Sequence, residues 1–187
     1  HTPTSQIVAA SDVYKRQDIT IVNPIWNSKK SEIIFYTAAR GHHTDIGGLT
    51  PGSMPCNSTD IHEEGIYIDN WKIVANGVFR EQEIKNKLLS GSYPARSPLT
   101  NIADLKAQIA ACKKGETELL KIVDKYSLET VFRFQELVCQ NAEDAVRDSI
   151  KTIKSTEIIY QMDNDLSGAV RKISIKLIPD KKNNSIE

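Results

Sequence analysis

The chain has no excess of either charge and no long apolar run. Its 24 basic side chains balance 24 acidic ones, which gives a formal net charge of zero at pH 7. Proteins that hold nucleic acid or an acidic membrane by bulk charge carry a surplus of lysine and arginine, so neither partner is predicted. No stretch approaches the roughly 18 consecutive apolar residues of a membrane-spanning helix.

Cysteine is scarce, and the three cysteines are far apart in the sequence. Cys56, Cys112 and Cys139 form neither a Cys-x-x-Cys pair nor a set that can pair completely into disulfides. The last two fall in helical patterns and are predicted to be small buried side chains. Thiols used in this way indicate a reducing cytoplasm.

Nucleotide-binding motifs are also missing. The glycine-rich stretch "DIGGLTPGS" contains neither Gly-x-Gly-x-x-Gly nor Gly-x-x-x-x-Gly-Lys-Ser/Thr. If the chemistry uses ATP, the nucleotide is therefore expected to bind elsewhere.

The sequence does contain an ordered succession of strands and loops. Two β-branched stretches, "DITIVNPIW" at 18–26 and "SEIIFYTAAR" at 31–40, flank a polar "NSKK" and predict a β-hairpin. Residues 41–65 are rich in glycine and proline and predict a long loop, which in a compact domain is usually functional or disordered. Two short apolar stretches follow, and Asn76-Gly77 between them is a turn signal.

Helices and two C-terminal strands come next. A short helix over "REQEIKNKLLSG" is predicted to end near Gly91. Asn101 is predicted to cap a helix that either breaks at Gly115 or runs on to Lys125, and Ser127 is predicted to cap another. The segments "EIIYQM" and "RKISIKLI" have the pattern of strands. Because strands and helices do not alternate regularly, the predicted fold class is α+β, with a β-hairpin, a long Gly/Pro-rich loop, two longer α-helices and C-terminal β-strands.

The stretch "ARGHHTDIGG" begins where the second predicted strand ends. His42, His43 and Asp45 offer imidazole and carboxylate ligands that suit Zn²⁺, Mn²⁺ or Fe²⁺. Adjacent side chains of a strand point to opposite faces, so either histidine is expected to share an ion with Asp45 more easily than with the other histidine. The alternative is a hydrogen-bonded polar turn with exposed histidines, and spacing alone favours it.

Asp18, Gly47 and Gly48 extend this candidate site. In an antiparallel hairpin the start of one strand lies beside the end of the other, which would place Asp18 near His42. The N–H groups of Gly47 and Gly48 could stabilise an anion or a developing oxyanion. On the residues alone, a surface aspartate and a turn that needs positive φ are simpler explanations.

Two further groups of side chains carry weaker signals. His62 and the two glutamates that follow it could supply a general base, although such a run is more often a solvated loop face. Arg40, Arg80 and Arg96 could each hold a substrate carboxylate through a guanidinium fork. Ordinary surface pairing is the simpler explanation for each arginine.

Several separated motifs resemble the hydantoinase B/5-oxoprolinase family. They are, in chain order, "DITIVNPIW", "ARGHHTDIGGLTPGSMP", "EEGIYI", "FREQEI", "NIADLKAQIAACKKG" and "LLKIVDKYSLETV". Motifs that recur in one order are far more specific than any of them singly, and the resemblance covers roughly residues 18–177.

The resemblance implies the metal-containing half of a two-part enzyme that opens cyclic amides at the expense of ATP. A hydantoinase A-like subunit or domain would bind ATP and Mg²⁺ and phosphorylate the substrate, a hydantoin or 5-oxoproline ring. Relatives carboxylate ketones, so an ATP-dependent ketone carboxylase is the alternative. By the family motif, Asp18, His42 and Asp45 are the implied ligands of a divalent metal, Zn, Mn or Fe. His43 belongs to the same motif, and the resemblance implies either a fourth ligand or a residue that supports the ligands.

The sequence departs from the family pattern just before Asp18. The letters "KRQD" stand where the family has "HxPD", so a histidine is missing, and with it one implied metal ligand. Residues 1–17 are predicted to be a foreign or poorly ordered leader, and residues 18–187 a partial hydantoinase B-like domain from a longer protein. A further interpretation is a structural or subunit-contact fragment that is inactive by itself.

Overall fold

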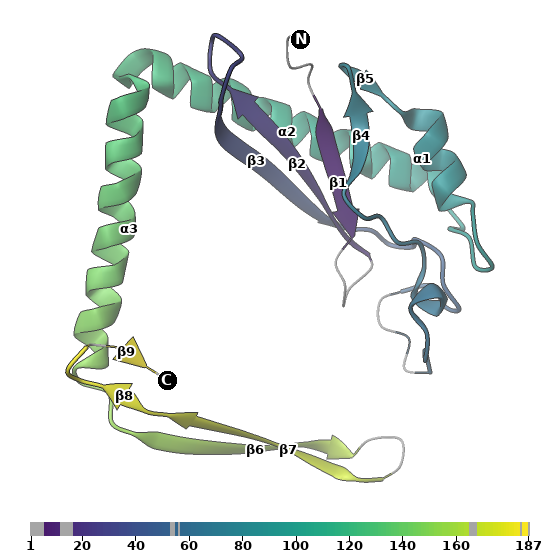
Figure 1. Cartoon of the computed structure of the whole chain (residues 1–187). Coiled ribbons are helices and arrows are strands. Elements are labelled where there is room, and N and C mark those ends of the chain that lie inside the picture. The colour runs from purple at the N-terminus through teal and green to yellow at the C-terminus, as the bar shows by residue number, and fades with distance from the viewer. Residues whose placement is uncertain are drawn as a thin grey trace. The chain divides into compact units, whose positions relative to one another are not determined.

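The chain forms two compact units, His1–Ile122 and Val123–Glu187. A computed structural model describes residues 6–11, 17–52, 55, 57–164, 168–183 and 185–186. Figure 1 labels their helices and strands in chain order. Within these described ranges, no helix is both long and apolar enough to cross a membrane.

The first unit is built on a five-stranded antiparallel sheet with the strand order β3-β2-β1-β4-β5 (Figure 1). Its strands are β1 (Ile7–Ser11), β2 (Asp18–Trp26), β3 (Ile33–His42), β4 (Trp71–Ala75) and β5 (Val78–Phe79). Buried and half-buried positions alternate along β2, as expected for a strand with one covered face. Two of its buried isoleucines, Ile19 and Ile21, form one apolar core with residues of the long helix α2 (Pro98–Tyr126).

The predicted hairpins of the first unit are present. β2 pairs antiparallel with β3, and the register places Asp18 opposite His42. β4 and β5 are joined by Asn76 and Gly77, whose φ values of 53° and 77° match the positive φ that a two-residue type I′ turn requires at both positions. The two turns therefore act as their sequences predict.

The helices of the first unit confirm the prediction with one correction, at the start of the longer helix. α1 (Glu81–Leu88) is the short helix. α2 begins at Pro98, because proline has no N–H to leave unpaired in a first turn, so Asn101 lies inside the helix and does not cap it. Of the two alternatives predicted for its end, the structure shows the second, because α2 runs through Gly115 to Tyr126. An added Cβ at Gly115 would lie 2.9 Å from Thr37 Cγ2. Glycine at this position permits the close approach of α2 to β3.

The prediction of a poorly ordered leader over residues 1–17 is wrong for Ile7–Ser11 and Gln17. β1 lies between β2 and β4, and its side chains Ile7 and Ala9 are fully buried. Gln17 is also buried. β2 and β4 form backbone hydrogen bonds with β1 on its two sides. This pairing is long-range, so the local sequence of residues 7–11 does not show it. Residues 1–5 and 12–16 lie outside the described residues, and both the foreign origin of this segment and a domain boundary at residue 18 stay predictions.

The second unit contains the helix α3 (Leu128–Ile150) and two β-ribbons. Ser127 caps α3, as predicted, because its Oγ accepts a hydrogen bond from Thr130 N. The predicted C-terminal strands are β6 (Thr156–Asn164) and β7 (Val170–Leu177), which pair antiparallel. A second small ribbon consists of β8 (Pro179–Asp180) and β9 (Ser185–Ile186). The α+β fold class is thus confirmed.

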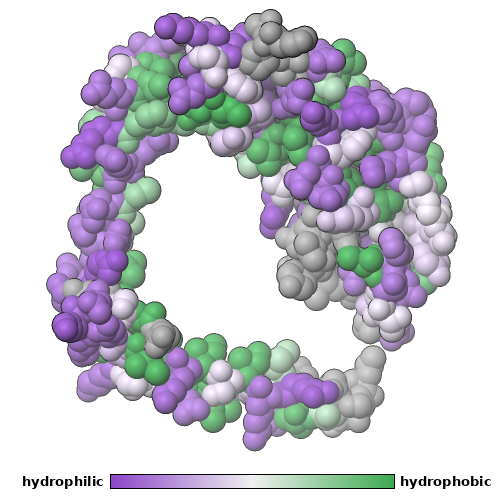
Figure 2. All heavy atoms as spheres, in the orientation of Figure 1, coloured by the Kyte–Doolittle hydropathy of each residue, from purple (hydrophilic) through white to green (hydrophobic). Residues whose placement is uncertain are grey.

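The ribbon of β6 and β7 gathers exposed apolar side chains on one face. Residues paired directly across two strands share a face, and Ile158–Ile175 and Tyr160–Ile173 are such pairs. All four side chains are exposed, and apolar side chains lie at the surface of this ribbon in Figure 2.

The cysteines confirm the predicted burial only in part. Cys112 is buried, and its thiol lies 3.6 Å from the carbonyl oxygen of Ile21, under the sheet. Cys139 is exposed, contrary to the prediction, because nothing in the described second unit packs over this side of α3. Cys56 lies outside the described residues.

Candidate functional site

The end of the β2–β3 hairpin brings Asp18 and His42 together. The two residues are partners in the strand register, and His42 Nδ1 lies 2.6 Å from Asp18 Oδ1. The His42 side chain is 56% exposed and that of Asp18 is 18% exposed, so an incoming ligand can reach the pair. Imidazole nitrogen and carboxylate oxygen together suit Zn²⁺, Mn²⁺ or Fe²⁺. This pair is the part of the predicted metal cluster that the structure assembles.

His43 points to the opposite side, as the alternation of a strand predicts, and is buried against α2. Its Nδ1 lies 3.2 Å from Asn101 Nδ2, and its Nε2 lies 3.2 Å from Gln108 Oε1. An amide nitrogen can only donate and an amide oxygen can only accept, so these partners assign the proton of a neutral ring to Nε2. Both ring nitrogens are therefore in use. His43 offers no free nitrogen to a metal ion in this structure, and whether it binds a metal or supports a ligand stays a prediction.

The carboxylate of Asp45 is nearly buried and is fully engaged by its own loop. Oδ1 accepts hydrogen bonds from Gly47 N and from Arg96 Nη1, both at 2.9 Å, and Oδ2 accepts one from Arg96 N at 3.0 Å. Among the described residues, no three metal-binding side chains come together. In this structure Asp45 thus binds Arg96 rather than completing a metal site with His42.

Gly47 and Gly48 have their N–H groups inside the loop. Gly47 N donates to Asp45, and Gly48 N donates to Tyr93 O at 3.0 Å. Their φ values are +92° and +97°, which L side chains rarely adopt. In this structure the loop uses both donors to satisfy its own backbone and carboxylate, and the predicted oxyanion role stays a prediction. The simpler explanation, a turn that needs positive φ, is the one that the geometry shows.

Two amide side chains of α2, Asn101 and Gln108, donate hydrogen bonds to the strands and the loop of the candidate site. The sequence pattern did not identify them as site residues. Gln108 Nε2 donates to Ile19 O at 2.8 Å and to Ala39 O at 2.9 Å, so it joins β2 to β3 next to the Asp18–His42 pair. Asn101 Nδ2 donates to Asp45 O at 2.9 Å as well as facing His43. Their spacing in the sequence could have identified them. Asn101 and Gln108 are seven residues apart, which places two amides on the otherwise apolar face of a helix.

The glutamates after His62 and the candidate arginines are engaged in local hydrogen bonds and ion pairs. Glu63 accepts hydrogen bonds from Asp60 N at the start of the short helix η1 (Ile61–Glu64), so its carboxylate caps that helix. Arg80 pairs with Glu83 on the same helix end, and Arg40 Nε donates to Thr20 Oγ1. These contacts fit the surface-pairing explanation for Arg40 and Arg80, whereas Arg96 pairs with the nearly buried carboxylate of Asp45.

Burial of His43 makes a pH-dependent prediction for the metal-free chain. Burial lowers the pKa of His43, and the hydrogen bond to Gln108 and the charge of Asp104 only partly oppose this. The unfolded chain therefore takes up a proton at higher pH than the folded chain. Above a pH of about 6.5, His43 is neutral in both states and its titration does not reduce the free energy of unfolding. Below that pH, the unfolded chain takes up the proton first, and the free energy of unfolding falls by up to about 1.4 kcal/mol per pH unit. The fall ends at the pH where folded His43 also becomes protonated.

Urea unfolding at pH 7.5 and 5.5, with EDTA present, measures this effect. We expect the loss of unfolding free energy on acidification to be smaller in His43→Gln than in the parent chain. His62→Gln, at an exposed histidine, serves as the control and should leave the loss unchanged. An equal pH dependence in His43→Gln and the parent would contradict the prediction.

Comparison with known proteins adds sequence relatives to this geometry. The family model described as hydantoinase B/oxoprolinase matches residues 10–185. A 5-oxoprolinase from Dictyostelium discoideum is 38% identical over 172 residues, which is 90% of this chain and 13% of that protein. A putative subunit of a D-/L-hydantoinase from Pseudomonas sp. (strain NS671) is 32% identical over 142 residues, 74% of this chain and 23% of that protein. The chain thus spans less than a quarter of the length of either curated relative.

Two solved structures have a similar fold. One is the ATP-dependent caprolactamase from Pseudomonas jessenii, with a TM-score of 0.77 and 22% identity, covering 96% of this chain and 32% of that one. The other is acetone carboxylase in a nucleotide-free state, with a TM-score of 0.76 and 17% identity, covering 92% of this chain and 24% of that one. At these identities the likeness concerns the fold alone.

Proposed function

Because this chain belongs to the hydantoinase B/oxoprolinase family, we propose that it is part of an ATP-dependent enzyme that hydrolyses a small cyclic amide, of the hydantoin or 5-oxoproline kind. The observation that carries the proposal is the open Asp18–His42 pair at the end of the β2–β3 hairpin, inside the family-like motif. Phosphoryl transfer from ATP to the amide oxygen would remove the amide resonance that protects the ring carbon. Water could then add to that carbon, and the ring C–N bond would break as a proton passes from the added water to the ring nitrogen. Hydrolysis of the acyl phosphate left by this cleavage would release inorganic phosphate and the open-chain acid.

Asp18 and His42 are proposed to hold a divalent cation, Zn²⁺, Mn²⁺ or Fe²⁺. Their donor atoms fit such an ion in kind and converge within 2.6 Å, although they are two donors and not a complete set. Metal ligands must be deprotonated, so the cation would replace the proton between His42 Nδ1 and Asp18 Oδ1. A divalent cation at this position would lower the pKa of bound water toward neutrality. Asp45 could join the set only if its ion pair with Arg96 opened.

A hydantoinase A-like subunit or domain is the proposed source of ATP and Mg²⁺. The likeness to one subunit of a hydantoinase supports an arrangement of more than one part. The sequence itself contains no phosphate-binding motif, which fits such a division of labour.

A chimera tests the proposed function. The matching 172-residue segment of the Dictyostelium 5-oxoprolinase would be replaced by the corresponding segment of this chain. We expect ATP-dependent ring opening of 5-oxoproline, measured as product formed per ATP hydrolysed. A chimera that folds and hydrolyses ATP but opens no cyclic amide would contradict the proposal.

The same chimera separates the other interpretations. Consumption of acetone that depends on added bicarbonate, without ring opening, would favour a ketone carboxylase. Loss of both reactions, together with no metal binding by the 187-residue chain, would favour a structural or subunit-contact fragment.

A further inference from the structure

Gly41 lies inside β3, in the middle of the family-like motif. A glycine inside a strand has no side chain to pack, and it often marks a place where another group approaches the backbone closely. Gly41 does not have a positive φ, so its own conformation does not require glycine. An added Cβ would lie 3.0 Å from both Cδ and Nε2 of Gln108 on α2. Gly41 therefore provides the space that the Gln108 side chain occupies.

The amide of Gln108 is held in one orientation. Its nitrogen Nε2 donates its two hydrogens to Ile19 O on β2 and to Ala39 O on β3, at 2.8 and 2.9 Å. Its oxygen Oε1 lies 3.2 Å from Nε2 of His43, the ring nitrogen that carries the proton. The side chain is buried. Rotating the amide by 180° would place its oxygen against two carbonyl oxygens, so the observed orientation is fixed by its partners.

The groups that Gln108 contacts are immediate neighbours of the Asp18–His42 pair. Two of them belong to the residues that flank His42 in the sequence, and a third belongs to the residue that follows Asp18. Side chains alternate between the two faces of a strand, so the pair lies on one face of the hairpin and Gln108 approaches from the other. Gln108 does not touch the donor atoms of the pair, and it can act on them only through the residues between.

We propose that Gln108 is a positioning residue of the candidate metal site and that Gly41 is the space it needs. Gln108 fixes the chain on both sides of His42 and just after Asp18, so that Nδ1 and Oδ1 stay within reach of one ion. The inference rests on the proposed function where it names a metal ion, but the geometry of the pair can be measured without metal. Residues that support metal ligands typically contribute about 10–100-fold in affinity.

The variant Gln108→Met tests this role, because methionine has a similar length but neither an amide donor nor an amide acceptor. We expect Zn²⁺ and Mn²⁺ to bind to the 187-residue chain about tenfold or more weakly in this variant. The metal-free chain is titrated with each ion, and circular dichroism verifies that the variant is folded. Unchanged affinity in a folded Gln108→Met would overturn the proposal.

Asn23→Leu is the matched control for general weakening of the hairpin. Asn23 is another buried amide of this sheet, toward the far end of β2 from the pair. Its Nδ2 donates to Glu116 Oε2 on α2 at 3.0 Å and lies 3.4 Å from Thr37 Oγ1 on β3. Its loss should lower the free energy of unfolding but leave metal affinity within about threefold of the parent. Equal losses of metal affinity in Asn23→Leu and Gln108→Met would contradict a specific role of Gln108.

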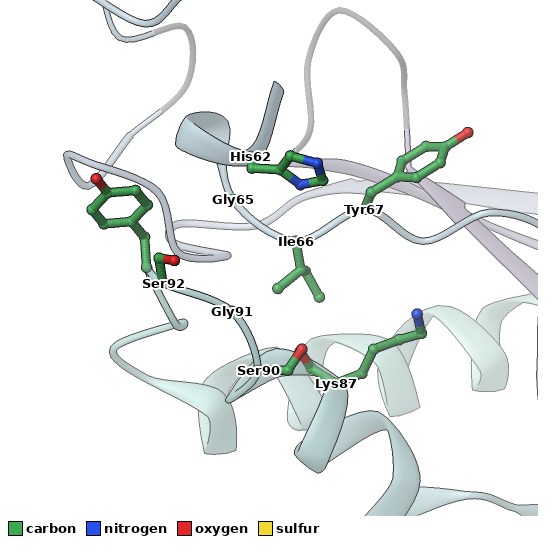
Figure 3. A pocket seen from close by; sticks show the side chains of 9 residues that line it. His62, Gly65, Ile66, Tyr67, Lys87, Ser90, Gly91 and Ser92 are labelled. Atoms are coloured by element: carbon green, nitrogen blue, oxygen red, sulfur yellow. The ribbon is translucent and has the colours of Figure 1, made fainter. Parts of the chain in front are cut away.

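A pocket of the first unit offers a second control. It has a volume of about 410 Å³ and is lined by two segments, residues 62–67 and residues 87–93 (Figure 3). Its lining includes neither Gln108 nor either member of the pair. Lys87→Gln, on the wall that α1 supplies, should therefore leave metal affinity unchanged.

A double-mutant cycle tests whether Gly41 and Gln108 act together. Gly41→Ala places a Cβ against the amide and should weaken metal binding by a factor similar to that of Gln108→Met. In the Gln108→Met background the same change should cause little further loss, because the hydrogen bonds are already absent and the flexible thioether can move aside. Fully additive losses would show that the two residues act independently and would overturn the proposal.

The ring ¹⁵N resonances of His42 in the metal-free chain provide a readout that needs no metal. They report the hydrogen bond between Nδ1 and Asp18 Oδ1, and we expect Gln108→Met to shift them toward their values in Asp18→Asn. Asn23→Leu should leave them unchanged. Unchanged ring resonances in Gln108→Met would reject the positioning role and leave the proposed function standing. If His42→Ala retains full metal affinity, the metal assignment of the proposed function fails, while the ring resonances still decide the role of Gln108.

Discussion

Replacing Gly47 with alanine is expected to lower the free energy of unfolding by about 4 kcal/mol or more, or to prevent folding of the first unit. An added Cβ would lie 2.1 Å from Tyr93 O, and the backbone has a φ of +92°. The obstructing carbonyl cannot easily move, because Tyr93 O accepts Gly48 N and the nearby Ala95 N donates to Leu88 O at 2.9 Å. Steric overlap and backbone strain therefore add at this position.

Gly52→Ala is the matched control for Gly47→Ala. Gly52 has a similar φ of +105°, but nothing lies within 4 Å of its added Cβ. We expect a loss of only about 1–2 kcal/mol, the cost of a left-handed conformation for alanine. Urea unfolding followed by circular dichroism measures both variants. Equal losses at the two positions would show that positive φ, and not the contact with residues 93–95, determines the effect.

Metal affinity of the chain is expected to fall by about a hundredfold or more in His42→Ala and in Asp18→Asn. Each change removes one of the two donor atoms that converge at the hairpin end, and changing residues that only support a metal ligand already costs about 10–100-fold. Titration of the metal-free chain with Zn²⁺ and Mn²⁺ gives the affinities. Asp69→Asn removes an exposed carboxylate after the long loop and should have no effect. Unchanged affinity in both His42→Ala and Asp18→Asn would contradict the assignment.

Asp45→Asn separates the ligand role suggested by the family motif from the structural role seen here. Its carboxylate is engaged by Arg96 and Gly47, so the substitution should cost about 2 kcal/mol of unfolding free energy, because the charge of Arg96 loses its partner. If Asp45 serves only the loop, the metal affinity of the chain should stay within about threefold of the parent. A loss as large as that in His42→Ala would show that Asp45 leaves Arg96 when a metal binds.

The hairpin, the Asn76-Gly77 turn and the start of α3 could be predicted from local patterns. β-branched residues that flank a polar turn, the pair Asn76-Gly77 and the cap Ser127 each act within a few residues of themselves. The proximity of Asp18 and His42 follows from the hairpin alone, since antiparallel pairing places the start of one strand beside the end of the other.

The helix start was harder to predict, because two local signals competed there. Asn101 is a good capping residue, yet Pro98 three residues earlier is a good first residue, and the helix begins at the proline. Once inside the helix, the Asn101 side chain faces His43 and Asp45 O and becomes part of the site. The central strand β1 was not predicted, because it is held in place by hydrogen bonds to β2 and β4 on its two sides.

By itself, the sequence determined the family, the α+β class and the position of the histidine motif at a strand end, because these depend on residue patterns that are close along the chain. Only the tertiary structure decided what each motif residue does. His42 stays open beside Asp18, while His43 is buried between Asn101 and Gln108. Asp45 is bound by an arginine 51 residues away, and residues 62–67 and 87–93 meet to form a pocket. Long-range hydrogen bonds and burial make these distinctions, and neither can be read from neighbouring letters.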